Sequence, residues 1–158
     1  MTGPLNRITI AKDAVAKTFS PPRRVRNNLL TMPRSIEHPE FLSLRDQFAV
    51  CRPVGPLSLE EAVRLIDDSL QYCKEHGIDR LLANVTGAVG FPSPSLTDRF
   101  WLITKWAESA RGFVTLSLVV PADMIMPDKI GITFANNRGM NGNVFSDEND
   151  AIQWLCSN

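Results

Sequence analysis

The sequence predicts an α/β fold: a single mixed, mostly parallel β-sheet with helices packed on it. From residue 58 onward, segments whose apolar residues recur at helical spacing alternate with short apolar runs. One of these runs, residues 79–85, shows no polar alternation, which is typical of a strand buried on both faces, and residues 113–120 are predicted to form a second buried strand. The chain has 158 residues, 44% of them hydrophobic, and is therefore long enough to bury a core.

Residues 1–38 are predicted to form a basic, irregular N-terminal arm, and residues 39–158 the α/β domain. The first 37 residues contain seven basic and two acidic side chains, so they carry a net charge of +5 and the rest carries −5. Such an arm can contact nucleic acid or a membrane surface, lie on its own acidic body, or stay solvated. The last two interpretations are favoured, because no dense cluster of Lys and Arg with interleaved aromatic residues is present. We therefore expect no nucleic-acid partner.

The domain begins with two short strands and a helix. Alternating polar and apolar residues over 41–50 predict a hairpin with one face in solvent. Ser58 and Glu61 then have the spacing of a capping box. Apolar residues follow at helical spacing as far as Cys73, and Gly77 stands where a C-terminal cap is expected.

Residues 79–85 predict a buried strand that leads into a loop. A helix is expected from about Pro94 to Arg111, because its apolar residues have helical spacing. Residues 113–120 predict a second buried strand, which Pro121 ends.

Residues 127–139 are compatible with either a strand or a helix. Their β-branched and aromatic residues favour a strand. Pro127 as a first helical residue and Gly139 as a cap favour a helix. We expect a helix, partly because parallel strands need crossover segments between them.

Residues 142–145 predict a brief strand, and residues 146–155 a last helix capped by Ser146. The apolar residues of that helix are expected to face inward: Ala151, Trp154 and Leu155. Right-handed crossovers then place the C-terminal ends of the parallel strands at one edge of the sheet. The loop at 86–92 lies at this edge, where α/β proteins usually bind their ligands.

Four stretches resemble the SpoIIAA-like, or STAS-like, group of small bacterial domains: "GPLSLEEAVRLIDDSL", "LLANVTG", "FANNRG" and "VFSDENDAIQWL". The resemblance covers about residues 40–156 and implies the STAS-like α/β fold. In anti-sigma-factor antagonists, a branch of this fold, an acidic residue ends the central strand, and a partner kinase phosphorylates a serine or threonine at the next helix start. Here Asn84 stands at the acidic position, and Ser93 and Ser95 stand near the helix start.

These serines and Arg99 form the candidate phosphorylation or anion-binding site. A helix N-terminus accepts anions, and Arg99, one turn further on, can pair with a phosphate. Ser93 before Pro94 also fits an ordinary N-cap, which is the interpretation we favour for it. Ser95 is then the more available hydroxyl.

The loop glycines and a second polar cluster are the candidate ligand rim. Gly87 and Gly90 allow a backbone to bend close to a ligand, although no phosphate-loop motif accompanies them. Asn137 and Arg138 either complement the end of the preceding helix or face the same rim as Asn84 and bind an anionic group.

We expect no catalytic residues, metal or cofactor. His38 is in an irregular segment and His76 ends a helix, while Asp67 and Asp68 are predicted on the solvated face of their helix. The cysteines are odd in number, lack CxxC spacing and are expected to be buried, reduced thiols of a cytoplasmic protein: Cys51, Cys73 and Cys156. No apolar run approaches the roughly 20 residues of a membrane span.

The leading interpretation is a non-enzymatic regulatory or protein-interaction domain. Its partner is expected to be a protein, such as a kinase or an anti-sigma factor, or a small anionic ligand. Two alternatives stay open. One is a small-molecule or lipid-binding domain similar to Sec14 domains, and the other is a homodimerisation module that uses the apolar surface of helix 94–111, with Trp101, Leu102 and Trp106.

Overall fold

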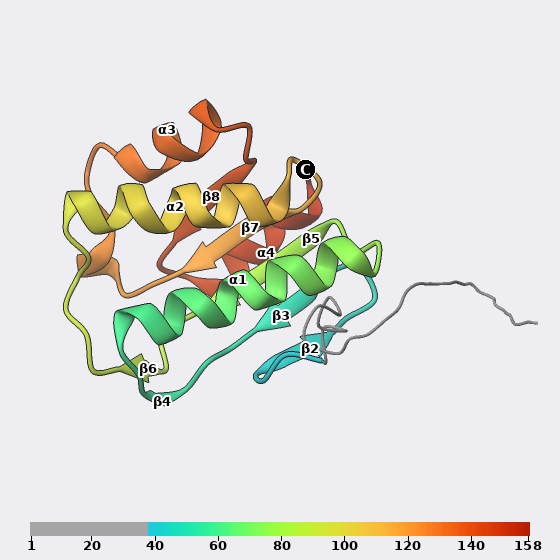
Figure 1. The fold of residues 1–158 in the computed structure, drawn as a ribbon, viewed down its shortest axis with the longest axis horizontal. Coiled ribbons are helices and arrows are strands. Elements are labelled where there is room, and N and C mark those ends of the chain that lie inside the picture. Colours follow the sequence, from blue (N-terminus) through green and yellow to red (C-terminus); the bar gives the residue numbers. More distant parts are fainter. Residues whose placement is uncertain (1–37) are drawn as a thin grey trace, which may run out of the picture. The chain divides into compact units, whose positions relative to one another are not determined.

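The computed structural model describes residues 38–158, which form a five-stranded sheet with helices on both faces (Figure 1). The first two strands in the sheet are antiparallel, and each later strand adds in parallel. In sheet order the strands are β2 (Leu42–Leu44), β3 (Ala49–Cys51), β5 (Arg80–Asn84), β7 (Thr115–Val119) and β8 (Gly142–Phe145). The prediction of an α/β fold with a mixed, mostly parallel sheet is confirmed. The predicted arm, up to residue 37, lies outside the described residues.

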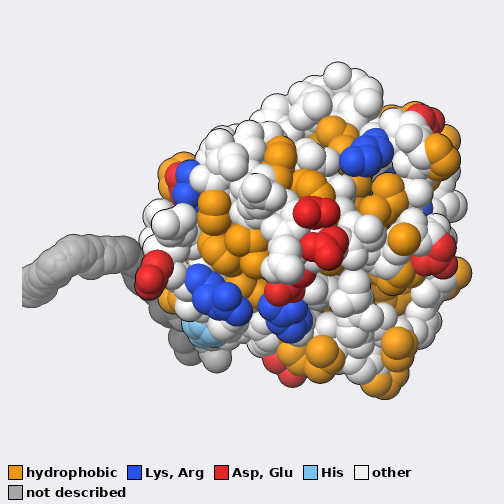
Figure 2. All heavy atoms as spheres, turned by 180° about the vertical axis from the view of Figure 1, so that it is seen from behind, with side chains coloured by type: hydrophobic (Ala, Val, Ile, Leu, Met, Phe, Trp, Pro, Cys, Tyr) orange, Lys and Arg blue, Asp and Glu red, His pale blue; other side chains and the backbone are white. Residues whose placement is uncertain are grey.

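Three helices cover one face of the sheet and one helix covers the other (Figure 1). The helices are α1 (Leu59–Glu75), α2 (Leu96–Ala110) and α3 (Ile130–Asn137) on the first face, and α4 (Glu148–Cys156) on the second. The short strands β4 (Gly55–Pro56) and β6 (Ala88–Val89) form a separate parallel pair, and a single 3-10 turn, η1 (Ala122–Met124), follows β7. On the α4 face, acidic, basic and hydrophobic side chains are interspersed (Figure 2).

Strand β7 is covered by helices on both of its faces. Leu116 and Leu118 face the side of α1, α2 and α3. Ser117 and Val119 face α4, where the Ser117 hydroxyl donates to the Ala151 carbonyl oxygen at 3.0 Å. Because helices cover both faces, apolar residues are favoured at successive positions.

Helix α1 confirms the predicted capping box. The Ser58 hydroxyl accepts from the Glu61 N–H, and the Glu61 carboxylate accepts from the Ser58 N–H, both at 3.0 Å. Gly77, just beyond the helix, has the positive φ of 72° expected of a C-terminal cap. Within the described part of the chain, no helix is long and apolar enough to cross a membrane.

Helix α2 begins later than predicted, and its N-cap is Ser95. The prediction of Ser93 as the cap is wrong. Asp98 stands three residues after Ser95, and the two residues form a reciprocal capping box with both distances at 3.1 Å. The same arrangement on Ser93 would place Leu96 at the third helical position, where no side chain could return the hydrogen bond.

The ambiguous segment at 127–139 is helical, as expected, although α3 begins at Ile130 and not at Pro127. Helix α4 is also confirmed, but its N-cap is Asp147 and the prediction of Ser146 is wrong. The Asp147 carboxylate accepts from the Asp150 N–H at 3.0 Å, and a negative charge is favourable at this end of a helix.

Candidate functional site

The loop after β5 is held by a second chain segment. Strand β6 pairs with β4, and the Leu57 N–H donates to the Val89 carbonyl oxygen at 2.7 Å. A Cβ on Gly87 would lie 2.9 Å from a Val54 methyl group, and one on Gly90 would lie 2.8 Å from the Leu57 carbonyl oxygen. Both glycines therefore permit the close approach of residues 54–57.

Gly90→Ala is expected to lower the free energy of unfolding by about 1 kcal/mol more than Gly55→Ala does, as measured by urea denaturation. Gly90 and Gly55 both have positive φ, 111° and 93°, so alanine strains the backbone at each. Only at Gly90 does the added Cβ meet a backbone atom, because nothing lies within 4 Å of a Cβ on Gly55. Equal losses in the two variants would contradict this account of the loop.

The structure brings Ser93 together with Arg99. The Arg99 Nη2 donates to the Ser93 hydroxyl oxygen at 2.9 Å, and both candidate serines are exposed. Ser95 is instead engaged in the capping box of α2. Each serine hydroxyl is exposed and accepts one hydrogen bond, so the structure gives Ser95 no greater availability than Ser93.

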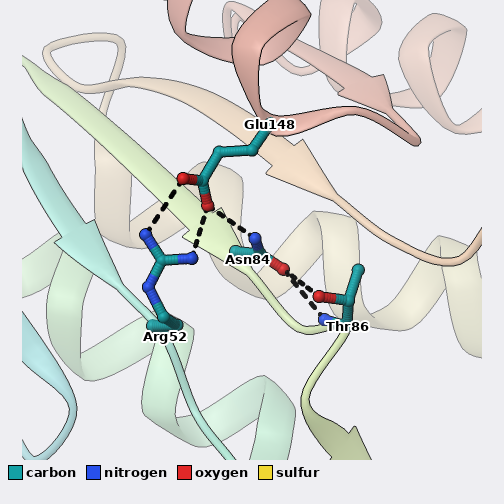
Figure 3. A network of polar contacts seen from close by, with 4 residues as sticks. All are labelled: Arg52, Asn84, Thr86 and Glu148. Carbon is teal, nitrogen blue, oxygen red and sulfur yellow. Dashed lines mark hydrogen bonds and ion pairs between the residues drawn. The ribbon is translucent and has the colours of Figure 1, made fainter.

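Asn84 belongs to a polar network between the ends of β3 and β5 and the start of α4 (Figure 3). Arg52 forms a bidentate pair with Glu148, with N–O distances of 2.5 and 3.1 Å. Asn84, only 6% exposed, donates from Nδ2 to Glu148 at 2.6 Å and accepts at Oδ1 from the Thr86 N–H and hydroxyl. It thus lies on the α4 side of the sheet.

The ion pair changes the titration of both partners. Hydrogen bonding to Arg52 lowers the pKa of Glu148, and the same contact raises the pKa of Arg52. Sequence reasoning missed this network, because 96 positions separate Arg52 from Glu148 and no motif spacing marks them.

The second polar cluster does not join the 86–92 loop. Arg138 lies over the Phe100 ring, 4.2 Å from its centroid. Asn137 is exposed at the end of α3. Both residues precede the N-terminal end of β8, whereas the loop follows the C-terminal end of β5. Because β5, β7 and β8 are parallel, the cluster and the loop lie at opposite ends of the strands.

The apolar surface of α2 also differs from the prediction. Leu102 and Trp106 are buried within the chain, and the Trp106 Nε1 donates to the Val63 carbonyl oxygen at 3.1 Å. The exposed apolar residues of this helix are Leu96, Phe100 and Trp101, at 51%, 45% and 43%. Of the three residues predicted for an interface, only Trp101 is available.

Two of the three thiols are buried in the domain, and the His76 ring packs against a neighbouring side chain. Cys51 and Cys73 are buried as predicted, and burial raises the pKa of both thiols, that of Cys73 to about 12. Cys156 is half-buried. The His76 Nδ1 lies 2.9 Å from the Tyr72 carbonyl oxygen, and the two rings stack.

An apolar pocket of about 130 Å³ lies between α2 and the sheet. Helix α2 packs mainly against α1 and α3 and stands off the strands beneath it. Leu118, in the central part of the sheet, therefore stays half-buried. The pocket lining includes Ile66, Ile103, Trp106, Leu118, Ile132 and Val144.

Two cations of the pocket lining, Arg99 and Lys129, border the segment 124–126: the Arg99 Nη2 donates to the Met124 carbonyl oxygen and the Lys129 N–H to the Met126 carbonyl oxygen, both at 2.9 Å. We call this part of the pocket the cationic end. Phe91, Pro94 and the segment 124–126 line the pocket beside them. Lys129 is exposed and Arg99 is half-buried, so this end reaches solvent. Among the ion pairs of residues 38–158, none involves either cation.

Fold and pocket together define an α/β domain with an apolar pocket beneath one helix and a cationic end near the carboxyl ends of the strands. A scan against protein-family models gave no match, and a search of curated proteins gave none. From the sequence, a ligand-binding domain stayed open as an alternative but no pocket could be located, because helical spacing is the same whether an apolar face meets another side chain or a void.

Proposed function

We propose that residues 38–158 form a non-enzymatic, STAS-like regulatory domain of the bacterial cytoplasm that binds a small apolar or amphipathic molecule beneath α2. The observation that carries the proposal is the apolar pocket between α2 and the sheet. Ligand pockets in proteins are mostly apolar with a few polar groups, and this one has Arg99 and Lys129 at one end.

The energetics of empty apolar space support uptake of a ligand. An unfilled cavity lowers stability by about 24 cal/mol per Å³. The pocket here has a volume of about 130 Å³ and opens to water at its cationic end, so only part of that cost applies to it. A molecule that fills the space restores the missing contacts, and because it binds only the folded state it stabilises the domain.

The test is the thermal shift of the full chain with 1-hexanol and toluene, two neutral probes, supported by native mass spectrometry. We expect both probes to raise the melting temperature of the wild type. In Val144→Phe, the larger ring occupies the pocket, so the shift should disappear. Val89→Phe is the control, because Val89 is exposed outside the pocket. The absence of any shift in the wild type would contradict the proposal.

A second candidate function is a phosphorylation switch at Ser93, read by a protein partner such as an anti-sigma factor. The contact between the Arg99 Nη2 and the Ser93 hydroxyl supports it, because a phosphate on Ser93 would meet a guanidinium already in place. A phosphate on Ser95 would break the capping box and face the carboxylate of Asp98. Homodimerisation through Leu96, Phe100 and Trp101 remains the third proposal.

Mass spectrometry of the protein isolated from the cells that make it is expected to find phosphate on Ser93 and not on Ser95. In vitro, Ser95→Ala should lower the free energy of unfolding by about 1 kcal/mol because it removes the N-cap of α2, whereas Ser93→Ala should leave it within about 0.5 kcal/mol of wild type. Phosphate on Ser95 alone, or equal losses in both variants, would contradict the switch at Ser93.

A further inference from the structure

From the cationic end of the pocket we infer that the ligand is a small monoanion: one carboxylate on a ring or a chain of about six carbons. The hydrocarbon part lies beneath α2, and the carboxylate binds Arg99. This inference rests on the proposed function and adds the chemical class of the ligand.

Arg99 is held in one orientation by neutral acceptors. Its Nε donates to the Pro94 carbonyl oxygen at 3.1 Å, and its Nη2 donates to the Ser93 hydroxyl at 2.9 Å and to the Met124 carbonyl oxygen at 2.9 Å. None of these partners carries a charge. The guanidinium is therefore fixed in place while its positive charge has no carboxylate partner among residues 38–158.

The same guanidinium has donors left for a ligand. A guanidinium has five N–H donors, two of them on Nη1. Among the described residues, no hydrogen bond involves the Arg99 Nη1. A carboxylate that enters at the cationic end can accept from Nη1 without displacing the bonds that fix the side chain.

The nearby helix end is a poor competitor for the anion. The N-terminus of α2 already has its own carboxylate, because Asp98 accepts from the Ser95 N–H. A second anion there would be repelled by Asp98. Lys129 borders the segment 124–126, as Arg99 does, and adds positive charge there. The anion site is therefore the Arg99 guanidinium and not the helix dipole.

The size of the pocket limits the hydrocarbon part. A cavity of about 150 Å³ holds one benzene molecule, and the pocket here measures about 130 Å³. A long acyl chain exceeds this volume, so most of it would stay in water. The pocket therefore favours an aromatic or short-chain acid over a membrane lipid.

The experiment compares hexanoate, 1-hexanol, dodecanoate and hexyl phosphate by isothermal titration of the full chain. We expect the wild type to bind hexanoate about tenfold more tightly than 1-hexanol, and at least as tightly as dodecanoate and hexyl phosphate. Arg99→Gln should remove this preference and leave the affinity for 1-hexanol within about twofold. Arg138→Gln, whose guanidinium lies on Phe100 outside the pocket, should change neither affinity.

Each contrary result has a separate meaning. Equal affinities of the wild type for hexanoate and 1-hexanol overturn the inference and leave the pocket function intact, whereas failure of both to bind overturns both. Tighter binding of dodecanoate or hexyl phosphate overturns the ligand class. If Arg99→Gln does not fold, Arg99→Met replaces it, because methionine keeps a flexible apolar stem and loses the charge. Unchanged hexanoate affinity in the folded variant would overturn the role of Arg99.

Discussion

Asp67→Ala is expected to lower the free energy of unfolding by about 3 kcal/mol. Asp67 is only 4% exposed and lies between α1 and α2. Its carboxylate accepts from the Ser109 hydroxyl and, at 2.8 Å, from the Gln71 amide, and it lies 3.8 Å from the Lys105 ammonium. Alanine leaves these donors without their acceptor and leaves a void between the helices.

Urea denaturation at pH 7 measures this effect, with Asp68→Ala as the matched control. Asp68 is half-buried and pairs with Arg64 one turn away at 3.6 Å, so its loss should lower stability by less than about 0.5 kcal/mol. Asp67→Asn keeps the shape and should lie between the two alanine variants. If Asp67→Ala and Asp68→Ala differ by less than about 0.5 kcal/mol, the carboxylate does not hold the helices together.

Glu148→Ala is expected to lower the free energy of unfolding by about 2 kcal/mol at pH 7. The variant leaves the buried Asn84 Nδ2 without its acceptor and removes the partner of Arg52. The ion pair itself contributes only part of this loss, because both side chains are partly open to water and solvent screens their attraction.

The effect of Glu148→Ala should depend on pH in a defined direction. The folded-state pKa of Glu148 is lowered from its ordinary value of 4.5, mainly by hydrogen bonding to Arg52. The folded state therefore takes up this proton less readily than the unfolded state. The stabilisation is present above pH 4.5 and is lost as the pH falls through the folded-state pKa. The difference in stability between wild type and variant should shrink as the pH is lowered.

Denaturation curves at pH 7, 5 and about 3 measure this difference. Ion pairs of this kind lose their contribution to stability below about pH 5, when the carboxylate is protonated. Glu108→Ala is the control, because Glu108 is exposed and its side chain makes no ion pair among the described residues. A difference between wild type and Glu148→Ala that stays constant from neutral to acid pH would contradict the role of the ion pair.

The architecture of the domain could be predicted because its signals are local. The capping box of Ser58 and Glu61 and the unalternated run at 79–85 each describe an element from neighbouring residues alone. The two misplaced caps, Ser93 and Ser146, show the limit of this approach. Each has a second acceptor side chain one or two residues further along, and hydrogen-bond geometry selects between them.

The polar side chains were harder to place. Asp67 was predicted on a solvated face, and this is wrong, because α2 packs over it. Asn84 was expected at a ligand rim, and it lies instead in the network with Glu148. In both cases the partner is far away in the sequence, so no local spacing could indicate it.

By itself the sequence determined the order and type of the elements, and with them the mixed, mostly parallel sheet, because hydrophobic periodicity and caps depend on near neighbours. Only the tertiary structure decided how closely α2 packs on the strands. That spacing determines which apolar side chains line a pocket and which pack against one another. It alone also placed the Arg99 guanidinium at the end of that pocket. The reason is physical: distances between packed elements depend on all the side chains between them, and these come from every part of the domain.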